Sequence, residues 1–147
     1  MDDLELRLAI YNLIVERQAV PSRKELQSLV ADPEQLDRRL QRLHQLHMIV
    51  LDDRPHRLGE IRMALPFAAE ATDFRVRIES GAWYANCAWD SLAIAAAMHE
   101  DAQITSHWSD TAEPLDLRIT NGTLSDTVGF IEFKIPAARW WDDIVET

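Results

Sequence analysis

The stretch "ADPEQLDRRLQRLHQLH", residues 31–47, constrains the fold of this chain more than any other. Asp32 is a favoured helix N-cap residue, and Pro33 suits the first helical position. An apolar stripe then follows at helical spacing: Leu36, Leu40, Leu43 and His47. The segment therefore predicts an amphipathic helix that turns one face toward a core.

Two further helices are predicted before it. Residues 3–18 carry apolar positions at helical spacing, which we expect to form the buried face: Leu4, Leu8, Tyr11 and Val15. Ser22 and Glu25 have the spacing of a capping box, which predicts a second short helix reaching about Val30. "MIVL", "DDRPH" and "RLGEIRM" then predict strand, turn and strand. Three helices followed by a small hairpin indicate a winged-helix-like unit over residues 1–64.

Residues 65–147 show a different pattern. "LPFAAEAT" is interpreted as a connector, and "FRVRI" alternates as a half-buried strand does. A helix is predicted from about Cys87 to Met98, followed by strands in "AQITSHW", "LDLRIT" and "VGFIEFKI", with "NG" as a hairpin turn. Pro136 opens a last helical stretch. The fold class is therefore α+β, with a small mixed sheet that carries a cysteine-bearing helix.

The charge of the chain is uneven. Residues 1–62 carry ten basic and eleven acidic side chains, whereas residues 63–147 carry five and fourteen, and the whole chain has a net charge of −10. An acidic C-terminal part repels phosphate backbones and anionic lipid. We therefore expect neither a membrane nor a nucleic acid as partner.

The single cysteine excludes an intramolecular disulfide and a cysteine-cluster zinc site. The start, "MDDLELRLAI", is too polar for a signal peptide, and no apolar run approaches the roughly 18 residues of a membrane span. A lone thiol stays reduced in the cytoplasm, where we expect this protein to work.

That cysteine lies in "WYANCAWD", residues 83–90. With Asn86 as N-cap, Cys87 would lie on the first helical turn and Asp90 one turn along the same face. A helix N-terminus favours a thiolate, which is a ligand for soft metals, and Asp90 would take the thiol proton and pass it on. The alternative is a small buried hydrophobic side chain beside an aspartate that complements the helix dipole.

Two stretches carry a resemblance: "WYANCAWDSLAIAAAMHEDAQITSHWSDTAEPLDLRITNG" and "VGFIEFKIPAARWWDDIVET". With the strand before them they cover residues 74–147 and look like the core of the organomercurial lyases (alkylmercury lyases), which also carry a winged-helix-like N-terminal domain. The resemblance implies cleavage of a carbon–mercury bond, giving hydrocarbon and Hg(II), with an organomercurial as partner and no resident cofactor. It further implies that Cys87 binds mercury as a thiolate and that Asp90 deprotonates the thiol and then protonates the carbon.

The chain departs from the family in one respect. In the family a second cysteine follows the "WWDDIV"-type segment and shares the mercury, and this sequence has no second cysteine. We therefore expect a core truncated at its C-terminus that exposes a sheet edge, with reduced or absent activity. A metal-binding remnant without turnover is one alternative.

Aromatic residues flank the cysteine and are interpreted either as walls of a pocket for the organic group or as core residues: Trp83, Tyr84 and Trp89. His99 and His107 are candidates for a second metal ligand, although ordinary surface histidines are the simpler interpretation. We expect Trp140 and Trp141 to pack in the core.

The winged-helix-like unit raises a function of another class, a transcriptional regulator that senses a soft metal through Cys87. Three arginines lie off the leucine stripe of the third helix, where a recognition helix would contact DNA: Arg38, Arg39 and Arg42. Glu34 and Asp37 share that helix, so we expect a solvated face and keep DNA contact as the alternative.

Overall fold

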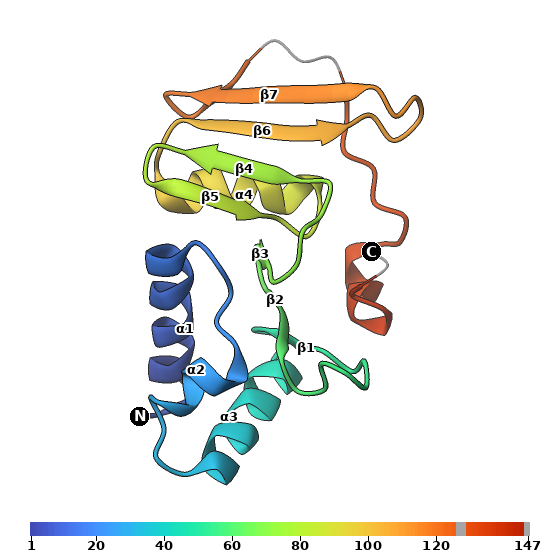
Figure 1. Ribbon diagram of the computed structural model, residues 1–147. Helices are drawn as coiled ribbons and strands as arrows, with labels where there is room; N and C mark the ends of the chain where they lie inside the picture. The colour runs from blue at the N-terminus through green and yellow to red at the C-terminus, as the bar shows by residue number, and fades with distance from the viewer. Residues whose placement is uncertain (126–128, 146–147) are drawn as a thin grey trace.

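A computed structural model describes residues 1–125 and 129–145. Three helices at the N-terminal end are followed by a three-stranded sheet and then by a five-stranded sheet with one helix. Figure 1 shows the helices at one end, the larger sheet at the other and the small sheet between them. The predicted α+β class is confirmed.

Each N-terminal helix begins directly after a capping residue, and the two capping signals predicted from sequence, Ser22 and Asp32, are confirmed. Helix α1 (Asp3–Arg17) starts with a capping box between Asp2 and Glu5, and α2 (Arg23–Gln27) with the predicted box between Ser22 and Glu25. Helix α2 ends earlier than the predicted Val30. Helix α3 (Pro33–Gln45) has Asp32 as its N-cap. Its leucine stripe is buried as predicted, whereas His47 lies beyond the helix end with a φ of 61°.

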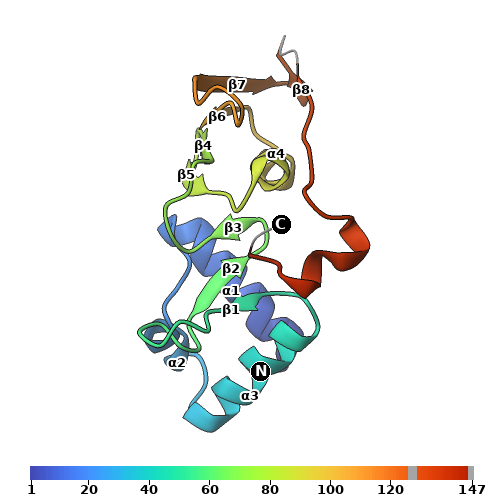
Figure 2. The same ribbon diagram turned by 90° about the vertical axis from the view of Figure 1, so that its right-hand side faces the viewer.

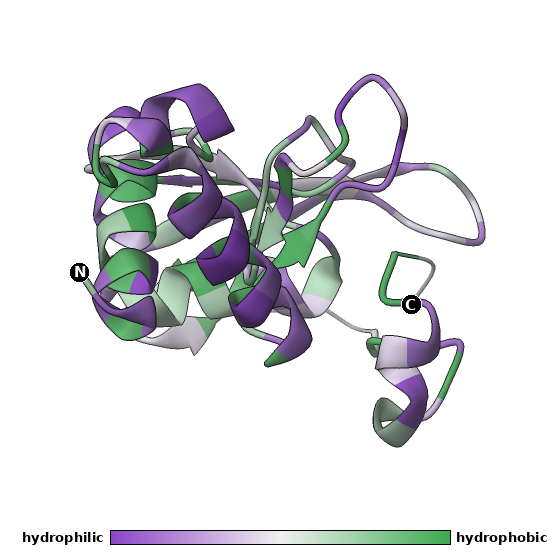
Figure 3. Cartoon of the chain, turned by 90° about the horizontal axis from the view of Figure 1, so that it is seen from below, coloured by the Kyte–Doolittle hydropathy of each residue, from purple (hydrophilic) through white to green (hydrophobic). Residues whose placement is uncertain are grey.

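The predicted buried face of α1 is wrong. Leu4 and Leu8 are 62% and 63% exposed, whereas the side chains that pack in the core are Leu6, Ile10 and Ile14. Apolar residues occur on more than one face of this helix, so periodicity alone does not select the buried one. Figure 3 shows hydrophobic and hydrophilic bands together on the helices of this end. Packing against α3 decides the face, and each large side chain buried there stabilises the fold by about 1.5–3 kcal/mol.

The small sheet extends into the predicted connector. Strands β1 (Val50–Leu51), β2 (Ile61–Ala64) and β3 (Phe67–Ala68) pair antiparallel in that order. Residues 65–72, predicted as a plain connector, therefore include a strand. Phe67 also forms an isolated bridge with Ala85, so the small sheet reaches the second region of the chain.

The larger sheet has the order β5-β4-β6-β7-β8. Its strands are β4 (Arg75–Ile78), β5 (Gly81–Tyr84), β6 (Ala102–His107), β7 (Pro114–Thr120) and β8 (Thr123–Leu124). Every strand pair in the described residues is antiparallel, so the prediction of a mixed sheet is wrong. Strands β4 and β5 form an antiparallel hairpin. The chain then crosses over through α4 (Ala88–Met98), and β6 pairs with the other edge of β4, where it runs parallel to β5. Strand β6 is therefore antiparallel to β4.

Helix α4 covers one face of this sheet, as Figure 2 shows with the strands almost edge-on. Val76 and Ile78 of β4 are buried on that face, whereas Arg75 and Arg77 point to the other. The predicted "NG" turn is confirmed, because Asn121 and Gly122 have φ of 50° and 72° between β7 and β8.

The C-terminal segment differs from its prediction. Val128 lies outside the described residues, and residues 129–135 form no strand. The last helical stretch is a 3₁₀ helix, η1 (Ala137–Asp142). Trp140 and Trp141 are only half-buried, so the prediction that they pack in the core is wrong. Trp141 instead stacks on His47, with ring centroids 3.9 Å apart, so the segment contacts the residues that follow α3.

Two side-chain hydrogen bonds tie α1 to the larger sheet. The indole Nε1 of Trp83 donates to the carbonyl of Ile14 at 2.9 Å, and Gln18 accepts from the backbone N–H of Ala82 at 3.2 Å. The N-terminal helix is therefore attached to the strand that leads into α4. Among the described residues, no helix is long and apolar enough to cross a membrane.

Candidate functional site

The candidate site lies where β5 leads into α4. Cys87 is the N-cap of the helix, with extended backbone at φ −152° and ψ −179°, and its carbonyl accepts the first helical hydrogen bond from Ser91 at 3.0 Å. Asn86 was predicted as the N-cap and instead precedes it. The Cys87 side chain makes no capping hydrogen bond with the described residues. Cys87 is in no disulfide, so its sulfur is a thiol.

Burial decides the protonation of this thiol. Cys87 is half-buried, and burial raises the pKa of its thiol above the usual value. Backbone N–H groups of Asp90 and Trp89 point toward the sulfur and lower the pKa in part, while the negative charge of Asp90 raises it. The expected thiolate at a helix N-terminus is thus not the resting form, because burial outweighs the N–H groups.

Asp90 lies one turn into α4 and is also half-buried. Burial raises the pKa of its carboxyl group, and the hydrogen bond from Asn86 Nδ2 to Asp90 Oδ2, 3.0 Å long, lowers it in part. The charge of Asp90 acts on the Cys87 thiol, so the structure brings the two predicted residues together. A carboxyl group whose pKa is raised holds a proton more readily, which suits proton exchange.

The N-terminal helix forms one side of this site. Tyr11 of α1 donates a 2.7 Å hydrogen bond to the carbonyl of Leu65, the residue that follows β2. Burial raises the pKa of the Tyr11 hydroxyl, and the charge of Asp90 adds to that shift. Tyr11 therefore lies within electrostatic reach of Asp90, although the two residues are far apart in the sequence.

This arrangement suits a soft metal compound that arrives at a neutral thiol. A thiol bound to such a metal loses its proton outright, whatever its resting pKa. The nearby Asp90 carboxylate can accept that proton. The site can therefore hold a metal at sulfur and store one proton close to it.

The three flanking aromatic residues do not line one pocket. Trp83 is 3% exposed and packs edge-on against Phe67 in the core. Tyr84 points to the opposite face of the sheet, where the guanidinium of Arg75 lies 5.9 Å from its ring centre. Trp89 is 54% exposed.

Trp89 does line a groove, together with the C-terminal segment. The groove has a volume of about 830 Å³ and is open to solvent. Its other lining residues are 130–137 and Trp140, and the ring of Phe133 packs between those of Trp89 and Trp140. Cys87 and Asp90 do not line it, so the groove adjoins the candidate site without containing its reactive atoms.

The two histidine candidates lie in exposed positions. His99 caps the C-terminal end of α4, so the 11-residue helix, about 16 Å long, separates it from Cys87. His107 is the last residue of β6 and is paired with Pro114. Residues 1–125 and 129–145 contain no cluster of three or more side chains with metal-ligand chemistry.

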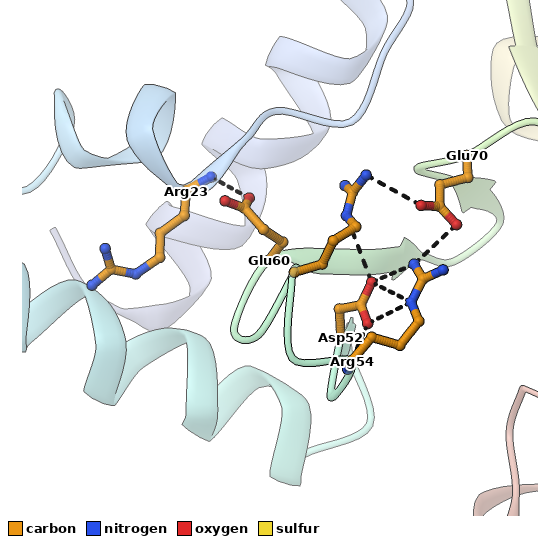
Figure 4. Close-up of polar contacts among 6 residues, drawn as sticks. Arg23, Asp52, Arg54, Glu60 and Glu70 are labelled. Atoms are coloured by element: carbon orange, nitrogen blue, oxygen red, sulfur yellow. Dashed lines mark hydrogen bonds and ion pairs between the residues drawn. The ribbon is translucent and has the colours of Figure 1, made fainter.

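A second buried carboxylate lies in the turn between β1 and β2. Asp52 is 2% exposed and accepts hydrogen bonds from Arg54, and Arg57 lies 3.7 Å away. Both arginines also bind Glu70, which follows β3. Figure 4 shows Arg54 between Asp52 and Glu70. The hydrogen bonds from Arg54 lower the pKa of Asp52 to about 2. This cluster therefore ties the turn to β3 and stays charged.

Two residues of the candidate site were missed by sequence reasoning. Asn86 is predicted as a capping residue, whereas its side chain binds Asp90, four residues along, from a position just before the N-cap. Tyr11 was assigned to the buried face of a separate helix. Its approach to Leu65 has no signal in the sequence.

Two comparisons with known proteins found similar proteins. Residues 67–147 match the family model described as "MerB: Alkylmercury lyase". The chain is also similar in fold to the "Crystal structure of the mercury-bound form of MerB2", with a TM-score of 0.64 and 23% sequence identity over 84% of this chain. The match spans 58% of the length of that chain. No curated protein sequence matches this one.

Proposed function

The chain belongs to the alkylmercury lyase family, and on that premise we propose that it cleaves the carbon–mercury bond of organomercurials by protonation. The observation that carries the proposal is the pairing of Cys87 with Asp90 at the start of α4, inside the matched residues. Cys87 binds the mercury atom, and Asp90 carries the proton.

The reaction has two steps. Mercury of the R–Hg⁺ group bonds to the Cys87 sulfur, and the thiol proton passes to the Asp90 carboxylate. Asp90 then gives this proton to the carbon, the carbon–mercury bond breaks with its electron pair going to the new C–H bond, and R–H leaves. Hg(II) stays on the sulfur and the carboxylate is regenerated. The raised pKa of Asp90 supports this role, because such a group holds a proton readily and transfers it to carbon.

In this proposal the second thiol ligand of mercury comes from a small molecule in solution. The sequence carries one cysteine, and two thiolates weaken a carbon–mercury bond more than one. An added low-molecular-weight thiol would supply the second ligand and then remove Hg(II) from Cys87. We therefore propose slow turnover without added thiol and faster turnover with it. We also propose a reducing compartment, the cytoplasm, as the place of action because Cys87 is free.

The regulator alternative has less support from the third helix. Arg39 and Arg42 both pair with Asp3, at 2.9 Å each. Arg38 pairs with Asp32 and Glu34 of its own helix. Arginines held by carboxylates are poor contacts for a phosphate backbone, since each carboxylate offsets the positive charge that would attract DNA.

The first experiment measures uptake of mercury. The wild-type chain should bind one equivalent of Hg(II), and Cys87→Ser should lose this binding. Asp90→Ala is the matched variant and should retain it, because it keeps the sulfur. Equal uptake by wild type and Cys87→Ser would refute the assignment of Cys87 as the mercury ligand.

A further inference from the structure

Asn86 bridges the start of α4 and the chain that leads out of β2. Its side-chain Nδ2 lies 3.0 Å from Asp90 Oδ2 and 3.1 Å from the carbonyl oxygen of Pro66. A carboxylate and a carbonyl both accept hydrogen bonds, so the nitrogen of the amide must face them, and both of its hydrogens are used. The orientation of the Asn86 amide is therefore fixed by its two partners.

The far end of this bridge is itself anchored. Pro66 follows Leu65, whose carbonyl accepts the hydrogen bond from the Tyr11 hydroxyl at 2.7 Å. Successive carbonyls are thus held by side chains from two different helical regions, Tyr11 from α1 and Asn86 from the start of α4. Groups that support a reactive side chain in this way limit its rotation.

The bridge engages only one oxygen of the Asp90 carboxylate. No described residue donates a hydrogen bond to Oδ1. Oδ1 is also not sealed in the interior, since the sealed polar side-chain atoms without a partner among the described residues belong to Arg7, Arg39, Arg57 and Ser106. One oxygen is therefore held and the other is free to exchange a proton.

We propose that Asn86 is a positioning residue that holds Asp90 Oδ2, so that Oδ1 takes the proton of Cys87 and delivers it to the carbon. This inference rests on the proposed function, since it assigns the oxygen that does the work of Asp90. Asn86 itself exchanges no proton and touches no reacting atom.

Two substitutions test the role of the amide. Asn86→Asp keeps the shape and replaces the donor with an acceptor that repels Oδ2, whereas Asn86→Ala removes the group. Misplacing a reactive group by about 1 Å costs roughly 100-fold in rate, so we expect hydrocarbon release to slow by about 10- to 100-fold in Asn86→Ala and at least as much in Asn86→Asp. Uptake of the organomercurial at Cys87 should stay at the wild-type level in both, since the sulfur is unchanged. The effect should thus fall on kcat and spare KM.

Gln103→Ala is the matched control. Gln103 also donates an amide hydrogen bond to a carboxylate, Asp116, on the exposed β6–β7 pair away from the site. The Gln103→Ala variant should release hydrocarbon at the wild-type rate. Wild-type release by both Asn86 variants would overturn the proposal, and so would a loss of uptake equal to the loss of release, because that result marks a merely structural role.

A spectroscopic arm separates this inference from the proposed function. The side-chain amide protons of Asn86, observed by NMR in the metal-free protein, should shift when Asp90 is replaced by alanine and stay in place in Gln103→Ala. If wild type releases no hydrocarbon even with added thiol, the proposed function fails, and this shift alone decides whether Asn86 holds Asp90. Asn86 resonances unchanged by Asp90→Ala would overturn the bridge.

Discussion

Asp52 and Asp90 are both shielded from solvent, yet their surroundings give them opposite properties. Arg54 and Arg57 surround Asp52 in the β1–β2 turn, and the hydrogen bonds from Arg54 lower its pKa to about 2. Asp90 has one neutral amide donor in Asn86, and burial raises its pKa. A carboxylate between two cations stays ionised and serves the structure, whereas one with a single neutral donor is available to exchange a proton.

The largest effect on stability should come from breaking the paired carboxylate. Asp52→Ala leaves Arg54 and Arg57 without their buried partner, and we expect the midpoint of thermal unfolding to fall by roughly 5–10 °C. Asp53→Ala is the matched control, because the neighbouring Asp53 is exposed, and it should change the midpoint little. Calorimetry of the three proteins measures both effects.

The pH dependence of that loss follows from the sign of the shift. The pKa of Asp52 is lower in the folded than in the unfolded state, so its contribution is present above the unfolded pKa of about 4 and is lost as pH falls toward 2. The difference between wild type and Asp52→Ala should thus shrink in acid. A constant difference from pH 7 to pH 2 would contradict the pairing.

Replacing Asp90 should change the midpoint of thermal unfolding less than replacing Asp52 does, and in the opposite direction. The pKa of Asp90 is raised on folding, so ionisation opposes folding once pH passes the unfolded pKa, and the full cost applies above the folded pKa. Asp90→Asn should therefore raise the unfolding midpoint by a few degrees at pH 7 and by little at pH 4. Asp110→Asn, at an exposed aspartate, is the control. If Asp90→Asn lowers the unfolding midpoint at pH 7, the ionised Asp90 stabilises the fold as Asp52 does, and the proposed difference between the two carboxylates is wrong.

The smallest effect is predicted for the arginines of α3, where carboxylates again offset cations. We expect no DNA complex that persists at moderate salt, because Arg39 and Arg42 share Asp3 as a partner. A gel shift with wild type and Arg42→Ala, at low and moderate salt, measures this. A complex that survives moderate salt and weakens in Arg42→Ala would favour the regulator.

Sequence reasoning succeeded where the signal is local. The capping box of Ser22, the N-cap at Asp32 and the turn at Asn121 each depend on a few adjacent residues, and the structure has all three. It failed where distant packing decides. The buried face of α1 is chosen by α3, and β3 forms because Phe67 finds partners in both β2 and Ala85.

The candidate site divides in the same way. The proximity of Cys87 and Asp90 follows from their spacing, which the sequence displays. The direction of the Cys87 pKa depends on burial, which the sequence does not display. The contacts of Tyr11 and Asn86 with the two carbonyls after β2 require the tertiary fold, as does the separation of Trp83 from Trp89.

Release of hydrocarbon from an organomercurial in the presence of excess added thiol tests the central claim most directly. Wild type should release the hydrocarbon. Asp90→Ala should take up the organomercurial at Cys87 and release hydrocarbon about 100-fold more slowly or worse, since proton transfer by a positioned group contributes about 10²–10⁴-fold. Equal release by wild type and Asp90→Ala, or no release by wild type under these conditions, would contradict the account.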